Sequence, residues 1–249
     1  MLCSYILFLY IWLMKNFYSQ FDFQSKLLFE VLTPDEKKLV YDAMEPLIIK
    51  KGSLLFYEDG VPTGIFQIKK GKAKKFKRSF SGSEQIFYIY TPNDVLGYHA
   101  LFGEERYQDS CEALEDLEVN FIAKDVFFQL LQDIPALQRT FIKNIGHEFG
   151  VLANIISVLA QKNQNARLAI NLLILENRFQ KHYKSGGIDL TREDLANIIG
   201  TSPESLGRSL KQFKEEGIIR VEKRTIFIIN RKKILQFLNL DTTMSNLYQ

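Results

Sequence analysis

The stretch TREDLANIIGTSPESLGRSLKQFKEEGIIRVEKRTIFI, residues 191–228, begins two helices in quick succession and then alternates like a strand. Thr191 can cap the first helix, and Gly200 is placed to end it. Ser202 can cap the second helix, with Pro203 at its first position. The short turn between these signals predicts a helix-turn-helix.

The second of these helices has one apolar face and one polar face. At 100° per residue, the apolar face holds Leu206, Leu210 and Phe213. The opposite face holds Glu204, Arg208 and Lys211. The first face would anchor the helix, and the second would be displayed.

A small hairpin follows the helix pair. Gly217 stops the second helix, and IIRV, a turn at EKR and TIFII then place Arg220, Lys223 and Arg224 near the tip. This is the outline of a winged helix-turn-helix. An α-helix fits the major groove of DNA, where Arg can donate two bonds to guanine and Glu can accept from the cytosine amino group. We therefore expect Glu204 and Arg208 to read bases, while cap and wing groups hold phosphates.

Other interpretations of the same residues exist. A protein-protein module can also show caps and an apolar face, and Glu204 with Arg208 could form an i,i+4 surface salt bridge. A scaffold that has lost its affinity for DNA is a further alternative. An enzyme is not expected, because the chain has no GxSxG, HExxH or GxxxxGK motif and no Cys-His arrangement.

Charge and cysteine content bound the class of protein. The chain has 249 residues, 46% of them hydrophobic, and a net charge of +3. Between positions 191 and 233 there are ten Lys or Arg and six Asp or Glu, so this region has an excess of +4. Cys3 and Cys111 are the two cysteines, too few for a disulfide framework or a metal cluster. We expect a cytoplasmic protein without a metal site and without a membrane partner.

The N-terminal run LCSYILFLYIWLM, ended by Lys15, is apolar. It is shorter than the roughly 20 residues that a spanning helix needs, and it lacks a basic start and a cleavage site. A misassigned upstream start codon fits it, because Met14 opens the ordinary sequence MKNFYSQF. A packed N-terminal helix and a membrane anchor are the alternatives.

Residues 27–122 change from helical to strand-like periodicity. LLFEVLTPDEKKLVYDAM predicts a helix capped by Thr33, with Pro34 at its first position and a stripe of Leu39, Val40 and Met44. The runs LLFY, GIFQIKKGKAKKFKR, EQIFYIY and EVNFI are separated by glycines and PND. Such short strands predict an antiparallel barrel or roll.

A long helix is predicted from Pro135 onward. Its apolar stripe recurs every three or four residues: Phe141, Ile145, Phe149, Leu152, Ile156 and Leu159. The stripe could pack on the roll of the same chain, or it could form the interface of a homodimer, which we favour. Another helix, 166–182, leads to KSGG at 184–187, a candidate flexible join.

Together these segments resemble the Crp/Fnr family of bacterial transcription regulators from about residue 27 to 238. The resemblance lies in LTREDLANIIGTSPESLGRSLKQFKEEGII and in GSLLF, IFQIKKGKAK and PNDVLGYHALFGEE. It implies an α+β fold with an antiparallel, jelly-roll-like β-roll, a long dimerisation helix and a C-terminal winged helix-turn-helix. The expected parts are an apolar extension, a cyclic-nucleotide-binding-like roll, a dimerisation helix and a DNA-binding domain, at residues 1–26, 27–134, 135–161 and 162–249.

The resemblance also implies partners and contacts. Family members bind two-fold related sites in double-stranded DNA as homodimers and work with RNA polymerase. Double-stranded DNA, a second copy of the chain and RNA polymerase are therefore expected partners here, together with a small-molecule effector in the roll. Glu204 and Arg208 occupy the family's base-reading positions. The residues expected at the DNA backbone are Thr191, Ser202, Ser205, Lys211, Lys223 and Arg224.

This chain departs from the cyclic-nucleotide binders of the family. They place a Glu after the Gly of the phosphate cassette and an Arg-Ser pair about ten residues later, but here Tyr98 follows Gly97, and Tyr107 and Gln108 stand at the pair. Arg106 is one residue away and could swing in. A cyclic phosphate without its cation would be unpaired, so the effector is expected not to be cAMP. A cAMP-responsive regulator with a rearranged phosphate site is the alternative.

The remaining effector positions point the same way. The adenine-reading place on the long helix holds Leu152 and Ala153, which cannot donate a side-chain hydrogen bond. His99 falls close to the sequence position at which a haem-binding member of the family has its histidine ligand. A hydrogen-bonded histidine in a pocket would explain its presence as well. Cys3 alone cannot ligate an iron-sulfur cluster. No cofactor is therefore identified, and neither haem nor an iron-sulfur cluster is expected.

Overall fold

The computed structural model describes residues 2–79, 82–183 and 186–238, with side chains from residue 11 onward. Two compact units make up the chain. The first combines Met1–Arg78 with Ile86–Asn154, and the second combines Ser79–Gln85 with Ile155–Gln249. The division falls inside a helix, because α5 runs without a break from Pro135 to Gln161.

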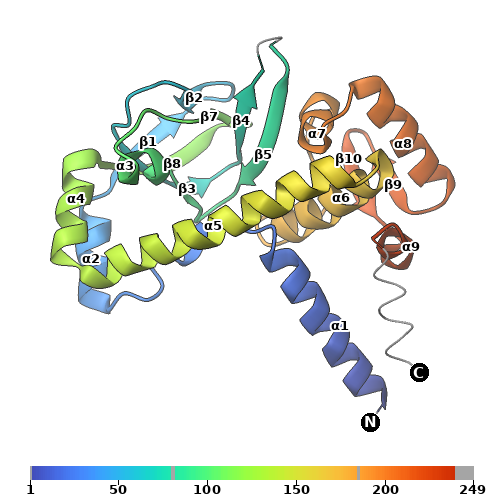
Figure 1. Ribbon diagram of the computed structural model, residues 1–249, viewed down its shortest axis with the longest axis horizontal. Helices are drawn as coiled ribbons and strands as arrows, with labels where there is room; N and C mark the ends of the chain where they lie inside the picture. The colour runs from blue at the N-terminus through green and yellow to red at the C-terminus, as the bar shows by residue number, and fades with distance from the viewer. Residues whose placement is uncertain (1, 80–81, 184–185, 239–249) are drawn as a thin grey trace. The chain divides into compact units, whose positions relative to one another are not determined.

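The first unit is built on two antiparallel four-stranded sheets (Figure 1). One sheet has the order β1-β8-β3-β6, with strands Glu45–Ile49, Leu117–Ala123, Gly64–Lys70 and Val95–Leu96. The other has the order β2-β7-β4-β5, with strands Leu54–Phe56, Ser110–Ala113, Ala73–Arg78 and Glu84–Tyr90. The predicted α+β class with an antiparallel β-roll is confirmed.

Tight turns keep these strands short. Gly71 joins β3 to β4 with φ 95°, a left-handed conformation that L side chains rarely adopt. A Cβ at Gly71 would lie 2.6 Å from the Leu117 side chain and 2.9 Å from the Asp116 carbonyl oxygen. Glycine is therefore required here both by conformation and by close packing.

The first unit also contains helices. They are α1 Leu2–Ser19, the 3-10 turn η1 Ser25–Leu27, α2 Pro34–Asp42, α3 Tyr98–Phe102, α4 Lys124–Asp133 and α5. Thr33 caps α2 as predicted: its hydroxyl accepts from the Glu36 N–H at 3.3 Å, and its own N–H donates to the Glu36 carboxylate at 2.8 Å. The residues of the predicted apolar stripe differ in burial. Leu39 is 54% exposed, and the neighbouring Val40 is buried instead.

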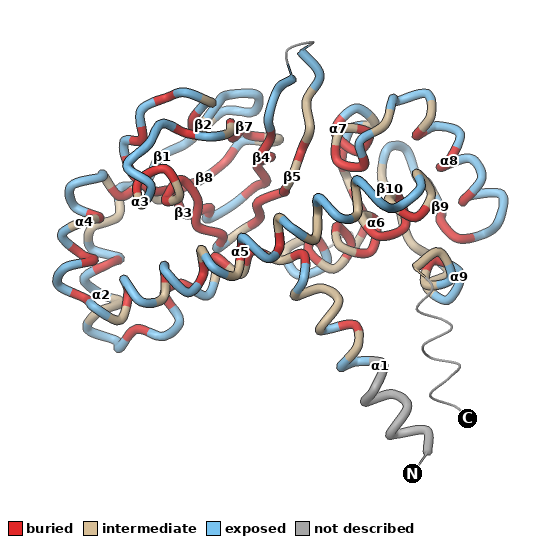
Figure 2. The backbone as a smooth tube through the Cα atoms, in the orientation of Figure 1, coloured by how far each residue is buried: buried red, intermediate tan, exposed pale blue. Residues whose placement is uncertain are grey.

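The core of this unit lies where α4 and α5 cover the roll. Phe141 of α5 is fully buried, with ring centroids 5.1 Å from Phe127 and 5.1 Å from Tyr98. The tube of α5 alternates between buried and exposed residues (Figure 2), as a helix with one face on a core requires. Phe141 therefore belongs to the core of its own chain, and its predicted place in a dimer interface is wrong.

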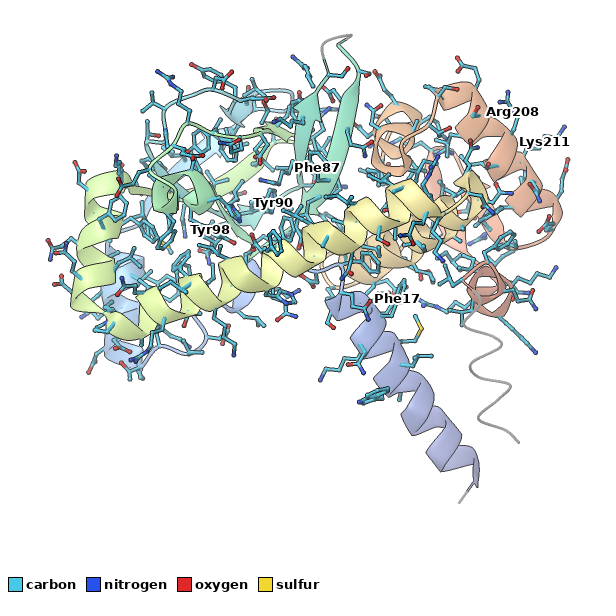
Figure 3. The ribbon with its side chains drawn as sticks, viewed as in Figure 1. Phe17, Phe87, Tyr90, Tyr98, Arg208 and Lys211 are labelled. Carbon is cyan, nitrogen blue, oxygen red and sulfur yellow. The ribbon has the colours of Figure 1, made fainter. Side chains whose placement is uncertain are left out.

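The N-terminal segment joins the same unit. Met14, Phe21 and Phe23 are buried, and the Phe23 ring stacks on Tyr88 with centroids 3.8 Å apart. Phe17, labelled in Figure 3, lies 5.4 Å from the ring of Phe21. Within the part of the chain that the structure describes, no helix has the length and apolarity needed to cross a bilayer.

The second unit contains a helix pair, a supporting helix and a hairpin. Its helices are α6 Gln164–Gln180, α7 Arg192–Ile199, α8 Pro203–Glu215 and α9 Arg231–Gln236. Its strands are β9 Ile219–Glu222 and β10 Thr225–Ile228. Residues 184–185 of the candidate join lie outside the described residues. Gly187 is packed on β10, because a Cβ there would lie 2.4 Å from the Thr225 methyl group.

Phe141→Ala should lower the free energy of unfolding by about 3–5 kcal/mol, because it removes a fully buried ring and leaves a cavity. Ile48→Ala is the control: Ile48 is 71% exposed, and a change within about 0.5 kcal/mol is expected. Urea unfolding at matched protein concentration measures both. A cost for Phe141→Ala as small as that of the control would contradict the packing described for α5.

Candidate nucleic-acid interface

The helix pair α7–α8 is closed by local signals. The Thr191 hydroxyl accepts from the Asp194 N–H at 3.0 Å, and the Ser202 hydroxyl accepts from the Ser205 N–H at 3.2 Å. Gly200 ends α7 with φ 66°, in the left-handed region. The predicted caps and the predicted end of α7 are confirmed. Thr191, Ser202 and Ser205 thus lie at the two helix N-termini, where N–H groups and the dipole favour an anion such as phosphate.

The two faces of α8 divide as the sequence predicts. Leu206, Leu210 and Phe213 are buried. Glu204, Arg208 and Lys211 are exposed, and the last two project outward from α8 (Figure 3). The second unit therefore anchors α8 by its apolar face and leaves a charged face accessible.

Local bonds orient the displayed groups. The Arg208 guanidinium donates to the Ser205 hydroxyl at 2.6 Å, and Lys211 lies 3.8 Å from the Glu215 carboxylate. Hydrogen bonds from its own backbone N–H and from the Ser202 hydroxyl lower the pKa of Glu204, which is therefore ionised at neutral pH. The face presents the Glu204 carboxylate, which only accepts hydrogen bonds, beside the Arg208 guanidinium, which only donates them. A carboxylate can accept from the cytosine amino group and a guanidinium can donate to guanine, so together they can match the two bases of a G·C pair.

The β9–β10 hairpin supplies further basic groups. Lys223 lies in its turn with φ 55° and is exposed. Arg224 donates to the Asp189 carboxylate at 2.9 Å, and its carbonyl accepts from Arg192 at 3.3 Å. Lys223 is thus presented at the tip, whereas the Arg224 side chain is held against the unit.

In the first unit, two of the predicted effector residues meet a carboxylate of α5. Gly97, with φ 93°, begins α3, and Tyr98 is fully buried. The Tyr98 hydroxyl donates to Glu148, and the His99 ring bonds to the other oxygen of the same carboxylate. Asn144 donates to the Tyr98 hydroxyl and to Glu148, both at 2.9 Å. These four side chains are called the Glu148 cluster below.

Burial sets the chemistry of the Glu148 cluster. Glu148 is 1% exposed, so its charge has little contact with water and depends on these donors. Burial, helped by the nearby Glu148 charge, raises the pKa of Tyr98 well above its ordinary value, which keeps the hydroxyl a donor. Sequence reasoning missed Glu148 and Asn144. The signal available was their spacing with Phe141 and Val151, which puts all four on one helix face.

The other effector candidates are not brought into this cluster. Tyr107 stacks on Phe56 with centroids 4.2 Å apart, and burial raises the pKa of Tyr107 to about 12. Arg106 is exposed and donates to the Asp59 carbonyl at 2.6 Å. The rest have separate surroundings: Gln108 bonds to Glu105, Leu152 is half-buried and Ala153 is exposed. Among the described residues, no three His, Cys, Asp or Glu are grouped as a metal site.

Both parts of the chain are similar to known protein domains. A model of the cyclic nucleotide-binding domain matches residues 46–133, and a model of the Crp-like helix-turn-helix domain matches residues 166–237. Electron transport regulator A of Shewanella oneidensis is 27% identical over 189 residues, with 75% of each chain covered. Transcriptional activator protein anr of Pseudomonas aeruginosa is 27% identical over 186 residues, covering 73% of this chain and 75% of that one.

The chain belongs to the Crp/Fnr family. A solved structure of a transcriptional regulator of the Crp/Fnr family from Eubacterium rectale shares the fold, with a TM-score of 0.68 and 21% identity. The match covers 85% of this chain and 97% of that one. The roll lies almost wholly within the part matched by the cyclic nucleotide-binding domain, and α7 with α8 lies within the part matched by the Crp-like helix-turn-helix domain.

Gly207→Ala tests whether the exposed face of α8 is closely approached. A Cβ at Gly207 would meet nothing within 4 Å, so Ala should stabilise the exposed helix by about 0.5–1 kcal/mol. If DNA lies against this face, the added methyl group should weaken binding. Gly150→Ala is the control, because Gly150 of α5 is equally open. Thermal unfolding and DNA titration measure both effects, and undiminished DNA affinity would show that DNA does not approach residue 207.

Proposed function

We propose that this DNA-binding transcriptional regulator of the Crp/Fnr type binds double-stranded DNA as a homodimer, with Glu204 and Arg208 as the base-reading residues. The carrying observation is the exposed charged face of α8, whose opposite face is fully used by the core of the second unit. In a homodimer, two copies of α8 would enter major grooves of half-sites about one helical turn apart.

Contacts to the DNA backbone would come from the groups around the two helix N-termini and the hairpin tip. We assign them to Thr191, Ser202, Ser205, Lys211 and Lys223, with Arg224 contributing after leaving Asp189. These contacts would supply affinity, and they would make binding weaken steeply with salt. Binding to no genomic fragment at low salt would favour a scaffold protein instead.

The homodimer is supported by a heptad row on α5. Alternating steps of three and four residues connect Ile142, Ile145, Phe149, Leu152, Ile156 and Leu159. Ile142, Phe149 and Ile156 are 57%, 78% and 61% exposed in the single chain. A second copy of α5 would bury this row as a two-stranded coiled coil, with Ile142 in the place that the sequence analysis gave to Phe141.

The roll is proposed to sense an effector other than cAMP. Tyr98 stands where a cyclic-nucleotide binder would offer a carboxylate, and its hydroxyl is already bonded to Glu148. Tyr107 stands in place of the phosphate-binding Arg and is stacked on Phe56. Occupancy of the roll would act on α5 and so on the two copies of α8. Regulation rather than catalysis, contact with RNA polymerase and a cytoplasmic location complete the proposal.

Arg208→Ala should weaken binding to a site selected from random duplexes by about 1–3 kcal/mol and relax one base position, because the guanidinium no longer reaches a base edge. Arg139→Ala is the matched control, since Arg139 is an exposed arginine of α5. Fluorescence anisotropy with single-substitution duplexes measures both. Unchanged selectivity in Arg208→Ala would remove Arg208 as a reader.

Phe149→Glu should convert the protein from a dimer to a monomer of 29.0 kDa, because it places two carboxylates in the heptad row. Val126→Glu is the control, since Val126 is 43% exposed on α4. Sedimentation equilibrium gives the mass of each variant. A dimer that persists in Phe149→Glu would show that α5 does not form the interface.

Addition of about 1 mM cAMP should leave the melting temperature and the DNA affinity unchanged, because the phosphate has no cation in the expected place. The same thermal-shift measurement with other nucleotides, haem and small metabolites searches for the effector. A rise in melting temperature with cAMP, lost in Arg106→Ala, would establish the alternative in which Arg106 completes a rearranged phosphate site.

A further inference from the structure

Gln164, the first residue of α6, is bonded to both the turn and the second helix of the helix-turn-helix. Its Nε2 donates to the Ser205 carbonyl at 2.8 Å and to the Ser209 hydroxyl at 2.7 Å. Its Oε1 accepts from the Thr201 hydroxyl at 2.9 Å. One side chain thus holds three points on either side of the start of α8.

Asn165 extends the same network one turn further along α8. The Ser209 hydroxyl donates to Asn165 Oδ1 at 2.7 Å, and Asn165 Nδ2 donates to Gln212 Oε1 at 3.0 Å. Ser209 is 5% exposed, so its hydroxyl is satisfied inside the protein as both donor and acceptor. Losing either amide would leave a buried polar group without that partner.

These bonds differ from the apolar anchoring of α8 in what they fix. Contacts of Leu206 and Phe213 hold the helix against the core, but dispersion and the hydrophobic effect have little directionality. Hydrogen bonds weaken steeply with misalignment, so the Gln164 bonds restrict rotation of α8 about its own axis. The restricted point is Ser205, and its hydroxyl is the acceptor for Arg208. A path of three residues therefore runs from Gln164 to the proposed base reader.

Gln164 lies at the start of α6, directly after the connection from α5. Asn163 caps α6 by accepting from the Ala166 N–H at 2.9 Å, and α5 ends at Gln161. Gln164 is thus the first helical residue after the break between α5 and α6. All of these residues belong to the second unit.

We propose that Gln164 is a positioning residue that sets the rotation of α8 and thereby the base preference of Arg208. The inference rests on the proposed function, because it requires α8 to read DNA. Its distinct content is that a residue outside the helix-turn-helix, which is not itself on the charged face, controls sequence discrimination rather than affinity for DNA in general.

The test compares Gln164→Met, which keeps the length of the side chain and removes its amide, with Asn171→Leu. Asn171 lies on the same helix, and its amide donates to the Arg167 carbonyl one turn earlier. The readouts on the full-length protein are affinity for the selected site, affinity for duplexes changed at the base pair that Arg208→Ala relaxes, affinity for unrelated DNA, and melting temperature.

Gln164→Met should reduce discrimination at that base pair about five- to tenfold, while affinity for unrelated DNA stays near that of Asn171→Leu. Its melting temperature should fall modestly below that of Asn171→Leu, because the Thr201 and Ser209 hydroxyls each lose a partner. In the Arg208→Ala background, Gln164→Met should cause no further loss. Ser209→Ala removes a single oxygen from the network and should produce a smaller loss of the same kind. It carries the test if Gln164→Met does not fold.

Two results would overturn the inference. Discrimination equal to wild type in both variants would show that the network does not orient Arg208. Equal loss on selected and unrelated DNA, or an additive loss in the Arg208→Ala background, would show a general structural role. A wild-type protein that binds no duplex would instead remove the proposed function, and is recognised before any variant is made.

Discussion

The packing of one face of helix α5 on the roll is the interaction on which the first unit depends. Its core face carries Leu137, Phe141, Asn144, Glu148 and Val151, all buried. At 100° per residue, the heptad row lies roughly a quarter turn away from this face. The core face therefore fixes α5 to the roll, while Ile142, Phe149 and Ile156 of the row stay exposed on the single chain. Ile145 packs partly against the core. A polar group in the core face is tolerated because Tyr98, His99 and Asn144 satisfy the Glu148 carboxylate.

Helix α8 of the helix-turn-helix also has one buried face and one exposed face. A short helix gains little stability alone, so α8 depends on Leu206, Leu210 and Phe213 for its place in the second unit. That burial leaves Glu204, Arg208 and Lys211 in solvent without cost to the core. The caps at Thr191 and Ser202 add local definition, and the amides of Gln164 and Asn165 add direction.

Features fixed by neighbours in the chain were predictable from sequence, and features fixed by distant contacts were not. The caps at Thr191 and Ser202, the end at Gly200 and the two faces of α8 depend on local chemistry, and the structure confirms them. On α5, Phe141 and Ile142 are adjacent apolar residues, and only packing against the roll decides which is buried. The surroundings of the effector candidates were not predictable. Their roles depend on how α3 and the β7 region approach other elements, which no local pattern encodes.

The Glu148 cluster has a consequence for how defects in this protein would be repaired by selection. Asn144 and Glu148 of the cluster lie on the same helix as the heptad row, so in the proposed homodimer a substitution that loosens Tyr98 or Asn144 would change the alignment of Ile142, Ile145 and Phe149 with a second copy. Compensating substitutions would then be recovered in the row itself, although its side chains do not form the cluster. Suppressor genetics on such a molecule would trace the geometry of one helix rather than a chain of touching residues.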